Sequence, residues 1–311
     1  MKAALVVAFL WGAAAAVLAE DPPAPRIVNV VNDFLAYHAA CRDATPETRA
    51  ARWNTMLEAK HPPFFRDAIY RRLEGQDLAN YKATCVGAFW AEVAPRMGEI
   101  AKLNEGVEER IRTVLADFRK VFPDFETATD FYVTISFSFR GKVVTVGERD
   151  VLGIGLEKLE GEGDLSLRIT LAHELFHLHH LPRFSAGGGL YRLLWTEGLA
   201  TYAAARVVPG QRMSTCLGFS AEKMNRCQEL LPKMAKQLRE NLGENDHRLK
   251  RAYFGAEDND LGVPPEAGYY VGLLVVQSLA AKQDVKDLAR LGPEQVLPLL
   301  ADALARLAPG G

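Results

Sequence analysis

Two short segments constrain the fold of this chain most: HELFH at residues 173–177 and WTEGLA at residues 195–200. In an α-helix, residues four apart lie on one face, about 6 Å apart along the helix axis. His173 and His177 can therefore bind one ion from the same side. A zinc site that keeps a position open for water has three protein ligands, and Glu197 is the natural third ligand. The two segments thus predict helices that meet at one zinc ion per chain.

The alternative interpretation of residues 173–177 is an ordinary helix with two hydrogen-bonded histidines. Leu171, Leu175 and Leu178 indicate that this helix is largely buried. A buried helix rarely carries two histidines and a glutamate for packing alone, because unpaired charge in the protein interior is costly. Together with Glu197, the segment favours a metal site.

These segments resemble the zinc-binding motifs of gluzincin metallopeptidases. Nineteen residues separate His177 from Glu197, which is the thermolysin-type spacing, and WTEGLATY at 195–202 resembles the second ligand helix. Over residues 131–279 the chain is most similar to a bacterial family of predicted zinc-dependent proteases, formerly described as a domain of unknown function. The resemblance implies a zinc-dependent peptidase that acts on peptides or proteins.

Other zinc families fit less well. A metzincin has a glycine three residues after its second histidine and a third histidine three residues further on, whereas this chain has His180 and Arg183 there. The chain also departs from the thermolysin pattern at one position. Thr201 stands where thermolysin-like enzymes have an aspartate that orients a histidine ligand, so another group must orient the histidine here.

The resemblance also implies a mechanism. Glu174 is expected to act as the general base, which takes a proton from the zinc-activated water and passes it to the leaving amine. The oxyanion that forms needs a second donor. The sequence YYVG at 269–272 resembles the Tyr-x-x-Gly turn of the aminopeptidase branch, which assigns this role to Tyr269, with Tyr270 as the alternative. It is also possible to interpret both tyrosines as core residues at the start of a helix.

Two other functions are compatible with the zinc motif. One is a non-catalytic, zinc-containing binding or chaperone-like protein of the same fold. The other is a zinc hydrolase that acts on a non-peptide amide or ester. Glu174 argues against the first alternative, because a protein that only binds zinc does not need a general base.

The pattern along the chain predicts an α+β fold. After a segment at 1–19 come a mostly helical N-terminal region at 20–125 and a catalytic region at 126–311. The catalytic region begins with a small antiparallel or mixed sheet, because residues 130–139, 141–146 and 151–156 are rich in β-branched and aromatic residues. We expect 141–146 to be the antiparallel partner of 130–139. The metal helix and further helices follow.

In gluzincins the strand before the metal helix forms the edge of the cleft, where an extended peptide adds as another strand. The resemblance therefore assigns substrate binding to strand 151–156, at Gly153, Ile154 and Gly155. Glu157 follows this strand and is a candidate acidic anchor for a substrate amine. The alternative is simply a weak strand that contains two glycines.

The N-terminus has the pattern of a secretory signal. Lys2 precedes an apolar run at 3–18, and Ala19 offers a small residue at the cleavage position. The run is short for a membrane span, although an uncleaved anchor is the alternative. We therefore expect an exported protein, either periplasmic or secreted.

Four cysteines in an exported chain suggest two disulfides. We favour Cys41 with Cys85 and Cys216 with Cys227, because each pair lies within one region of the sequence. Four buried thiols are the alternative.

The formal net charge of −2 gives no nucleic-acid signature. No stretch after the signal region predicts a membrane span.

Overall fold

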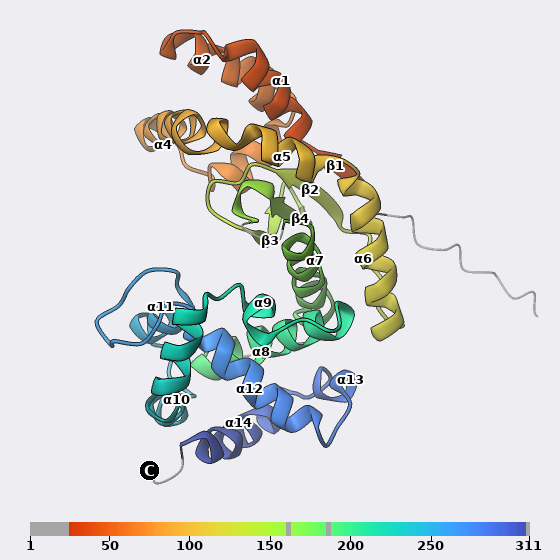
Figure 1. Ribbon diagram of the computed structural model, residues 1–311, viewed down its shortest axis with the longest axis vertical. Helices are drawn as coiled ribbons and strands as arrows, with labels where there is room; N and C mark the ends of the chain where they lie inside the picture. Colours follow the sequence, from red (N-terminus) through yellow and green to blue (C-terminus); the bar gives the residue numbers. More distant parts are fainter. Residues whose placement is uncertain (1–24, 160–162, 185–187, 309–311) are drawn as a thin grey trace, which may run out of the picture.

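The structure is a computed structural model that describes residues 25–159, 163–184 and 188–308. The predicted signal segment at 1–19 lies outside these ranges. Figure 1 shows a group of N-terminal helices above a small sheet and a second group of helices below it, with the vertical helix α7 (Gly163–His180) between the two groups. This mixture of helices and one small sheet confirms the predicted α+β class.

The N-terminal helices are held together by aromatic packing. The rings of Phe34, Trp53 and Phe89 lie with their centroids 5.6–6.1 Å apart. Phe64 stacks on Tyr132 of the sheet at 4.4 Å, so these helices pack directly on the strands. The elements are α1 (Val31–Cys41), α2 (Pro46–Trp53), α3 (Pro62–Phe64), α4 (Gly75–Ala88), α5 (Met97–Asn104) and α6 (Val107–Val121), with short π- and 3-10 segments η1 (Asn54–Glu58), η2 (Phe65–Ile69), η3 (Phe89–Val93) and η4 (Ala94–Arg96).

The sheet has four strands in the order β1-β2-β4-β3. β1 (Ile27–Asn29) and β4 (Arg149–Gly155) both pair in parallel with β2 (Asp130–Thr134), and β3 (Gly141–Val146) pairs antiparallel with β4. Residues 27–29, which the sequence predicts to lie in the mostly helical region, form strand β1 of the sheet. The mostly helical N-terminal region and the region from residue 126 onward therefore share one sheet.

The expected pairing of 141–146 with 130–139 is wrong. β3 and β4 are joined by the two-residue turn at Gly147 and Glu148, and such a turn places consecutive strands side by side. β4 is buried at every position from Val151 to Gly155, which is typical of an interior strand covered on both faces. β2 therefore occupies the other side of β4, and β3 is left at the edge of the sheet.

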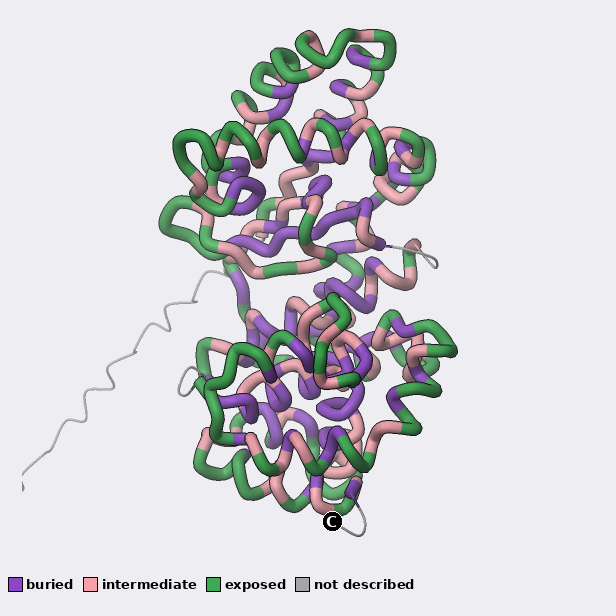
Figure 2. The backbone as a smooth tube through the Cα atoms, turned by 90° about the vertical axis from the view of Figure 1, so that its left-hand side faces the viewer, coloured by how far each residue is buried: buried purple, intermediate pink, exposed green. Residues whose placement is uncertain are grey.

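The C-terminal half is helical and has a continuous buried interior, which is purple in Figure 2. At its centre, α8 (Leu190–Val207) and α12 (Ala267–Ala280) cross very closely. A Cβ atom on Gly198 would lie 2.6 Å from the carbonyl of Gly272, so glycine at both positions permits this crossing. After the 3-10 segment η5 (Leu156–Lys158) and α7, the elements are α8 (Leu190–Val207), α9 (Met213–Leu217), α10 (Ala221–Glu240), α11 (His247–Phe254), α12 (Ala267–Ala280), α13 (Val285–Leu288) and α14 (Pro293–Leu307).

Within the described ranges, no helix combines the length and the apolar character needed to cross a membrane.

Candidate metal centre

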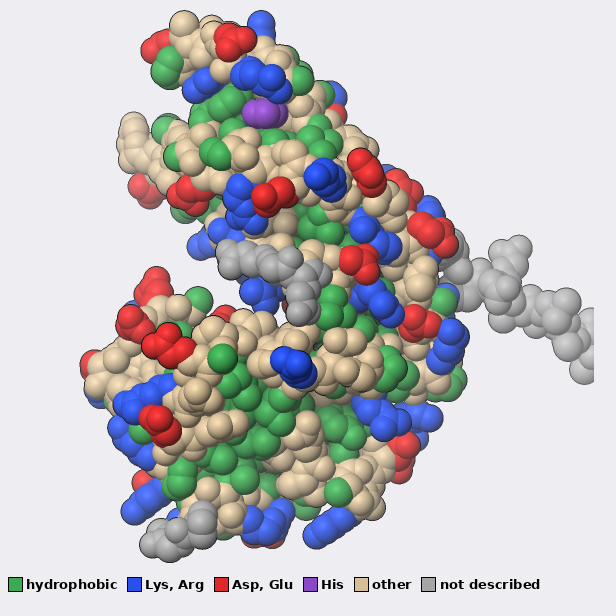
Figure 3. Space-filling model, viewed as in Figure 1, with side chains coloured by type: hydrophobic (Ala, Val, Ile, Leu, Met, Phe, Trp, Pro, Cys, Tyr) green, Lys and Arg blue, Asp and Glu red, His purple; other side chains and the backbone are tan. Residues whose placement is uncertain are grey.

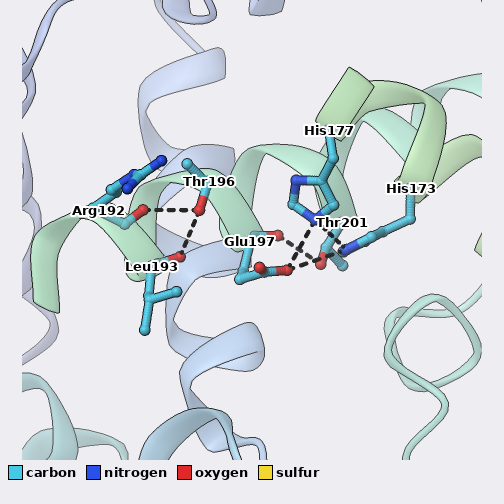
Figure 4. A network of polar contacts seen from close by, with 7 residues as sticks. All are labelled: His173, His177, Arg192, Leu193, Thr196, Glu197 and Thr201. Carbon is cyan, nitrogen blue, oxygen red and sulfur yellow. Dashed lines mark hydrogen bonds and ion pairs between the residues drawn. The ribbon is translucent and has the colours of Figure 1, made fainter. Parts of the chain in front are cut away.

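The two ligand helices of the sequence prediction meet. α7 carries His173 and His177, and the adjacent helix α8 carries Glu197. The Nε2 atoms of the two histidines lie 3.0 Å apart, and Glu197 Oε2 lies 3.1 Å from His173 Nε2 and 3.2 Å from His177 Nε2. Figure 4 shows these three atoms pointing toward one another from the two helices. The structure thus brings together the three residues that the sequence predicts as ligands.

This donor set fits zinc. Ligand atoms about 2.0–2.1 Å from a tetrahedral zinc ion lie roughly 3.3 Å from one another. The three atoms of His173, His177 and Glu197 are already close to that separation, and they form the one cluster of potential metal ligands found among the described residues. All three side chains are only 10–18% exposed, so they form a largely buried site.

The charges at the site explain why these side chains converge. Burial alone would raise the pKa of the Glu197 carboxyl, but the imidazoles of His177 and His173 hold that pKa well below its usual range. Burial lowers the pKa of His177, but the carboxylate of Glu197 outweighs this effect and raises that pKa to about 9. Glu197 is therefore an anion held between two imidazoles. A divalent cation bound to all three side chains can take the place of the positive charge that the imidazoles supply.

Thr201 does not take over the role of the aspartate found in thermolysin-like enzymes. Its Oγ1 donates to the backbone oxygen of Glu197, one turn earlier in α8, at 2.8 Å. His177 Nδ1 is buried and has no hydrogen-bond partner among the described residues. The polar contacts of the His177 ring among the described residues are therefore those of Nε2 with His173 and Glu197, and no carboxylate orients the ring through Nδ1.

Glu174 lies beside the ligands and lines two cavities that meet at the site. Its neighbour across the cleft is the backbone of Gly141, the first residue of β3. A Cβ atom on Gly141 would lie 2.7 Å from Glu174 Cγ and 2.7 Å from Thr170 Cγ2. Burial raises the pKa of Glu174, and the imidazoles of His177 and His173 partly oppose that shift. The environment therefore favours a carboxyl group that readily accepts a proton.

Tyr269 also lies at the site. It lines both cavities, and its ring centroid is 6.2 Å from that of His173. The close crossing of α8 and α12 at Gly198 and Gly272 positions Tyr269 beside the ligands, since Tyr269 precedes Gly272 by one turn of α12. Burial and the carboxylate of Glu197 raise the pKa of Tyr269 well above its usual value, so its hydroxyl keeps its proton.

Tyr270, the alternative to Tyr269, is buried and does not line either cavity. Its charge interaction is with Cys227, on the side of α12 that faces α10. Of the two tyrosines, the structure therefore places only Tyr269 beside the candidate ligands.

The expected edge strand is wrong. Gly153, Ile154 and Gly155 belong to β4, which lies between β2 and β3 and is buried. The glycines in β4 make room for the connection between β2 and β3 instead of a substrate. A Cβ atom on Gly155 would lie 2.4 Å from the backbone oxygen of Phe139, and one on Gly153 would lie 3.0 Å from the ring of the same residue.

The strand that lines the cleft is β3, at Gly141, Lys142 and Val143. Gly155 N donates to Arg140 O at 2.9 Å. This bond makes Arg140 and Gly155 a hydrogen-bonded pair. Hydrogen-bonded and non-hydrogen-bonded pairs alternate along an antiparallel ladder, so Gly141 and Val143 occupy non-hydrogen-bonded positions and their backbone groups point away from β4. These two residues therefore present N–H and C=O groups at the free edge of the sheet. The alternating, half-exposed pattern of GKVVTV, compared with the continuous apolar pattern of VLGIGL, is the signal that distinguishes the two strands.

Glu157 does not serve as an acidic anchor in the cleft. It is 4% exposed, and its carboxylate accepts hydrogen bonds from Ser136 N at 3.1 Å and from Phe137 N at 2.8 Å. Ser136 Oγ also donates to it, at 2.9 Å. Glu157 thus holds the connection between β2 and β3, in which Phe137 adopts a left-handed backbone conformation with φ of 63°. Sequence reasoning missed this structural role.

The two predicted disulfides are not formed, and all four cysteines are free thiols within the described part of the chain. Cys41, Cys85 and Cys227 are buried among apolar residues, where a cysteine packs as a small hydrophobic side chain. Burial raises the pKa of Cys85 to about 12 and that of Cys227 to about 11. The alternative of four buried thiols therefore describes Cys41, Cys85 and Cys227, whereas Cys216 is a half-buried thiol.

One protein-family model, described as "Predicted Zn-dependent protease (DUF2268)", matches residues 136–298, which is just over half of the chain. The match begins in the connection before β3 and extends into α14, so it covers all the residues of the candidate site. Neither a curated protein nor a solved structure matches the chain.

Proposed function

The chain belongs to the family described as predicted Zn-dependent proteases, and from this premise we propose that it is a zinc-dependent peptidase with Glu174 as its general base. The observation that supports this proposal most strongly is the convergence of His173 Nε2, His177 Nε2 and Glu197 Oε2 next to the carboxylate of Glu174. One zinc ion per chain would be held by these three residues. A site that only binds zinc has no need for the fourth side chain.

Bound zinc supplies the Lewis acidity that acidifies a water molecule and polarises a peptide carbonyl. The residues of the chain supply the proton transfers. Glu174 accepts the proton of the attacking water on its carboxylate and then donates it to the nitrogen of the leaving amine. The raised pKa of Glu174 suits both steps, because the buried carboxyl holds the proton between them.

Tyr269 and β3 position the substrate in this proposal. The hydroxyl of Tyr269, which keeps its proton, donates a hydrogen bond to the carbonyl oxygen as negative charge develops on it. The outward-facing backbone groups of Gly141 and Val143 pair with an extended peptide, which adds to the free edge of β3 as a further strand. The substrate would thus lie between the edge of the sheet and the metal helix.

The test compares the wild type with Glu174→Gln. Both proteins are analysed for bound zinc and incubated with a mixed peptide library, and the products are identified by mass spectrometry. We expect equal zinc content and a loss of cleavage of roughly 10²–10⁴-fold in the variant, because glutamine cannot accept the proton. Equal cleavage by the variant would exclude Glu174 as the base. Absence of cleavage by the zinc-loaded wild type would favour a binding protein instead.

Export with cleavage after Ala19 is a second part of the proposal, and it rests on the signal pattern of residues 1–19. N-terminal sequencing of protein recovered from the envelope or medium of expressing cells tests it. A mature N-terminus at Glu20 is the expected result, and full-length protein confined to the cytoplasm would contradict it.

A further inference from the structure

Two cavities meet at the metal centre and differ in character. The first, of about 610 Å³, lies between β3, α7, α8 and α11, and we call it the basic cavity because Lys142, Arg192 and Lys250 line it. The second, of about 560 Å³, lies toward α9, and we call it the aromatic cavity because Phe137, Phe139 and Phe219 line it. His173, Glu174 and Tyr269 line both. The candidate catalytic residues therefore stand where the two cavities join.

The basic cavity carries an excess of positive charge. Among the described residues that line it, the only carboxylates are Glu174 and Glu197, and Glu197 is engaged by the two imidazoles. Lys250 Nζ donates to two neutral acceptors, the backbone oxygen of Gly188 and the side-chain oxygen of Asn245. None of the ion pairs formed by the described residues includes Lys142 or Lys250. A bound zinc ion would add to this positive charge.

The aromatic cavity has a more apolar lining. Its apolar wall includes Ile169 and Leu217 in addition to the three phenylalanines, and its charged lining residues have both signs. Its one carboxylate besides Glu174 is Glu266, which pairs with Lys223 at 2.7 Å. This cavity is therefore suited to a large apolar side chain rather than to a charged one.

Figure 3 shows the hollow that separates the upper and lower halves of the molecule, with Lys and Arg side chains, in blue, at its edge. Because a cavity continues on each side of the metal centre, a peptide can extend past the site in both directions. Neither Glu157, which is buried in the sheet connection, nor Glu266, which pairs with Lys223, is a free carboxylate for a substrate's terminal amine. The site therefore favours binding of an internal segment of a substrate peptide over binding of the peptide's N-terminus.

We propose that the substrates are acidic peptides cleaved at an internal bond, with an acidic side chain in the basic cavity and a large apolar side chain in the aromatic cavity. This inference rests on the proposed peptidase function. Attraction between an acidic side chain and the cavity lysines acts over a few ångströms in a partly buried cleft, where salt screens it only in part. We place the acidic residue on the side of the basic cavity, since three cationic side chains and two carboxylates line that cavity, whereas Arg140 and Lys158 are matched in number by Glu174 and Glu266 in the aromatic cavity.

The test uses peptides blocked at both ends, with one phenylalanine at the centre and a Glu, Gln or Lys two residues away on one side or the other. We expect kcat/KM to fall in the order Glu, Gln, Lys for one of the two sides, by about tenfold between Glu and Lys at low salt. The preference should shrink as NaCl is added. Peptides with free ends should show no advantage over blocked ones.

Reversing the charge of a lysine in the basic cavity tests whether this cavity causes the preference for Glu peptides. Lys142→Glu is the suitable variant, because Lys142 is exposed and its side chain forms none of the hydrogen bonds or ion pairs found among the described residues. Its charge also acts on Glu174, so the ratio of rates for two peptides is compared rather than a single rate. It should lower or reverse the ratio of kcat/KM for the Glu and Lys peptides. Lys236→Glu is the matched control, since Lys236 is an exposed lysine of α10 that lines neither cavity, and it should leave that ratio unchanged.

The outcomes separate this inference from the proposed function. Cleavage of Glu, Gln and Lys peptides at equal rates would overturn the acidic preference and leave the peptidase intact, and cleavage of free-ended peptides alone would overturn the internal-bond preference. No cleavage of any peptide by zinc-loaded protein would overturn the peptidase proposal, and the inference with it. Fluorescence anisotropy of labelled peptides bound to the inactive Glu174→Gln variant gives a second measurement, in which the Glu peptide should bind about tenfold more tightly than the Lys peptide.

Discussion

Gly141 of β3 lies against Glu174 of α7 so closely that a Cβ atom on the glycine would be 2.7 Å from Glu174 Cγ. The edge of the sheet and the candidate general base are therefore fixed relative to each other by a backbone contact. An extended peptide bound along β3 would come within reach of Glu174 without any movement of the sheet. In the proposed mechanism, this contact would connect substrate binding to proton transfer.

Gly141→Ala should disrupt this arrangement. The added methyl group must displace Glu174, Thr170 or the start of β3, and misplacement of a catalytic group by about 1 Å can reduce a rate by about 10²-fold. We expect kcat to fall by a factor of that order while the bound zinc is retained. Gly98→Ala, in α5, is the control, because a Cβ atom there has no neighbour within 4 Å. Equal activity of both variants would show that the contact is unimportant.

Glu197→Ala should lose zinc. Removal of one of three protein ligands leaves two histidines on one helix, which hold the ion much less firmly. Metal analysis after dialysis against a weak chelator should show full occupancy in the wild type and strongly reduced occupancy in the variant. Thr201→Val, one turn further along α8, removes only a hydroxyl that bonds to the helix backbone and should keep its zinc. Full occupancy in Glu197→Ala would exclude Glu197 as a ligand.

Tyr269→Phe should reduce kcat by about 10²–10³-fold, which is the usual cost of one lost oxyanion donor. Zinc content should stay unchanged, because the hydroxyl is not a ligand. Tyr270→Phe provides the comparison, since Tyr270 is buried, lines neither cavity and should affect activity little. Steady-state kinetics on one peptide substrate decides the matter. A larger loss in Tyr270→Phe would reverse the assignment.

His180 should make the fold sensitive to acid. Its ring is fully buried and stacks between Phe176 at 5.3 Å and Phe184 at 5.1 Å, and neither ring nitrogen has a partner among the described residues. Burial and nearby positive charges lower its pKa to about 3. The unfolded chain gains a proton at His180 below about pH 6.5, whereas the folded chain does not, so stability falls as pH drops from about 6.5 toward 3.

His180→Phe removes this titration and keeps the ring stacking. The free energy of unfolding of the variant, relative to that of the wild type, should therefore rise by up to about 1.4 kcal/mol for each pH unit below 6.5. Denaturant unfolding at pH 7.5 and pH 5.5 measures it, with chelator present throughout so that zinc release does not differ between the proteins. Parallel pH dependences of the two proteins would contradict a neutral buried His180.

All four cysteines should titrate as thiols. Reaction with a chromogenic disulfide reagent in denaturant, without reductant, should yield four thiols per chain. In the native protein Cys85 and Cys227 should react slowly, because burial limits access to them and the raised pKa values of about 12 and about 11 leave little thiolate. A yield of no thiols would restore the two disulfides that the sequence favours.

The sequence by itself determined the candidate ligands. His173 and His177 are four residues apart on one helix, and helix geometry is local, so their common face follows from the spacing alone. The α+β class likewise followed from stretches of helical and β-rich residues. The need for a third protein ligand pointed to Glu197, the family resemblance supported it through the spacing from His177, and the distances of 3.1 and 3.2 Å place it at the predicted site.

Only the tertiary structure decided the order of the strands, the environment of Glu157 and the state of the cysteines. Strand order depends on which residues pack across distant parts of the chain, and the continuous apolar pattern of β4 indicates an interior strand without showing which strands lie on its two sides. The position of Tyr269 depends in the same way on the crossing of Gly198 and Gly272, 74 residues apart in the sequence. Local pattern fixes periodicity, whereas non-local packing fixes which side chains share a cavity.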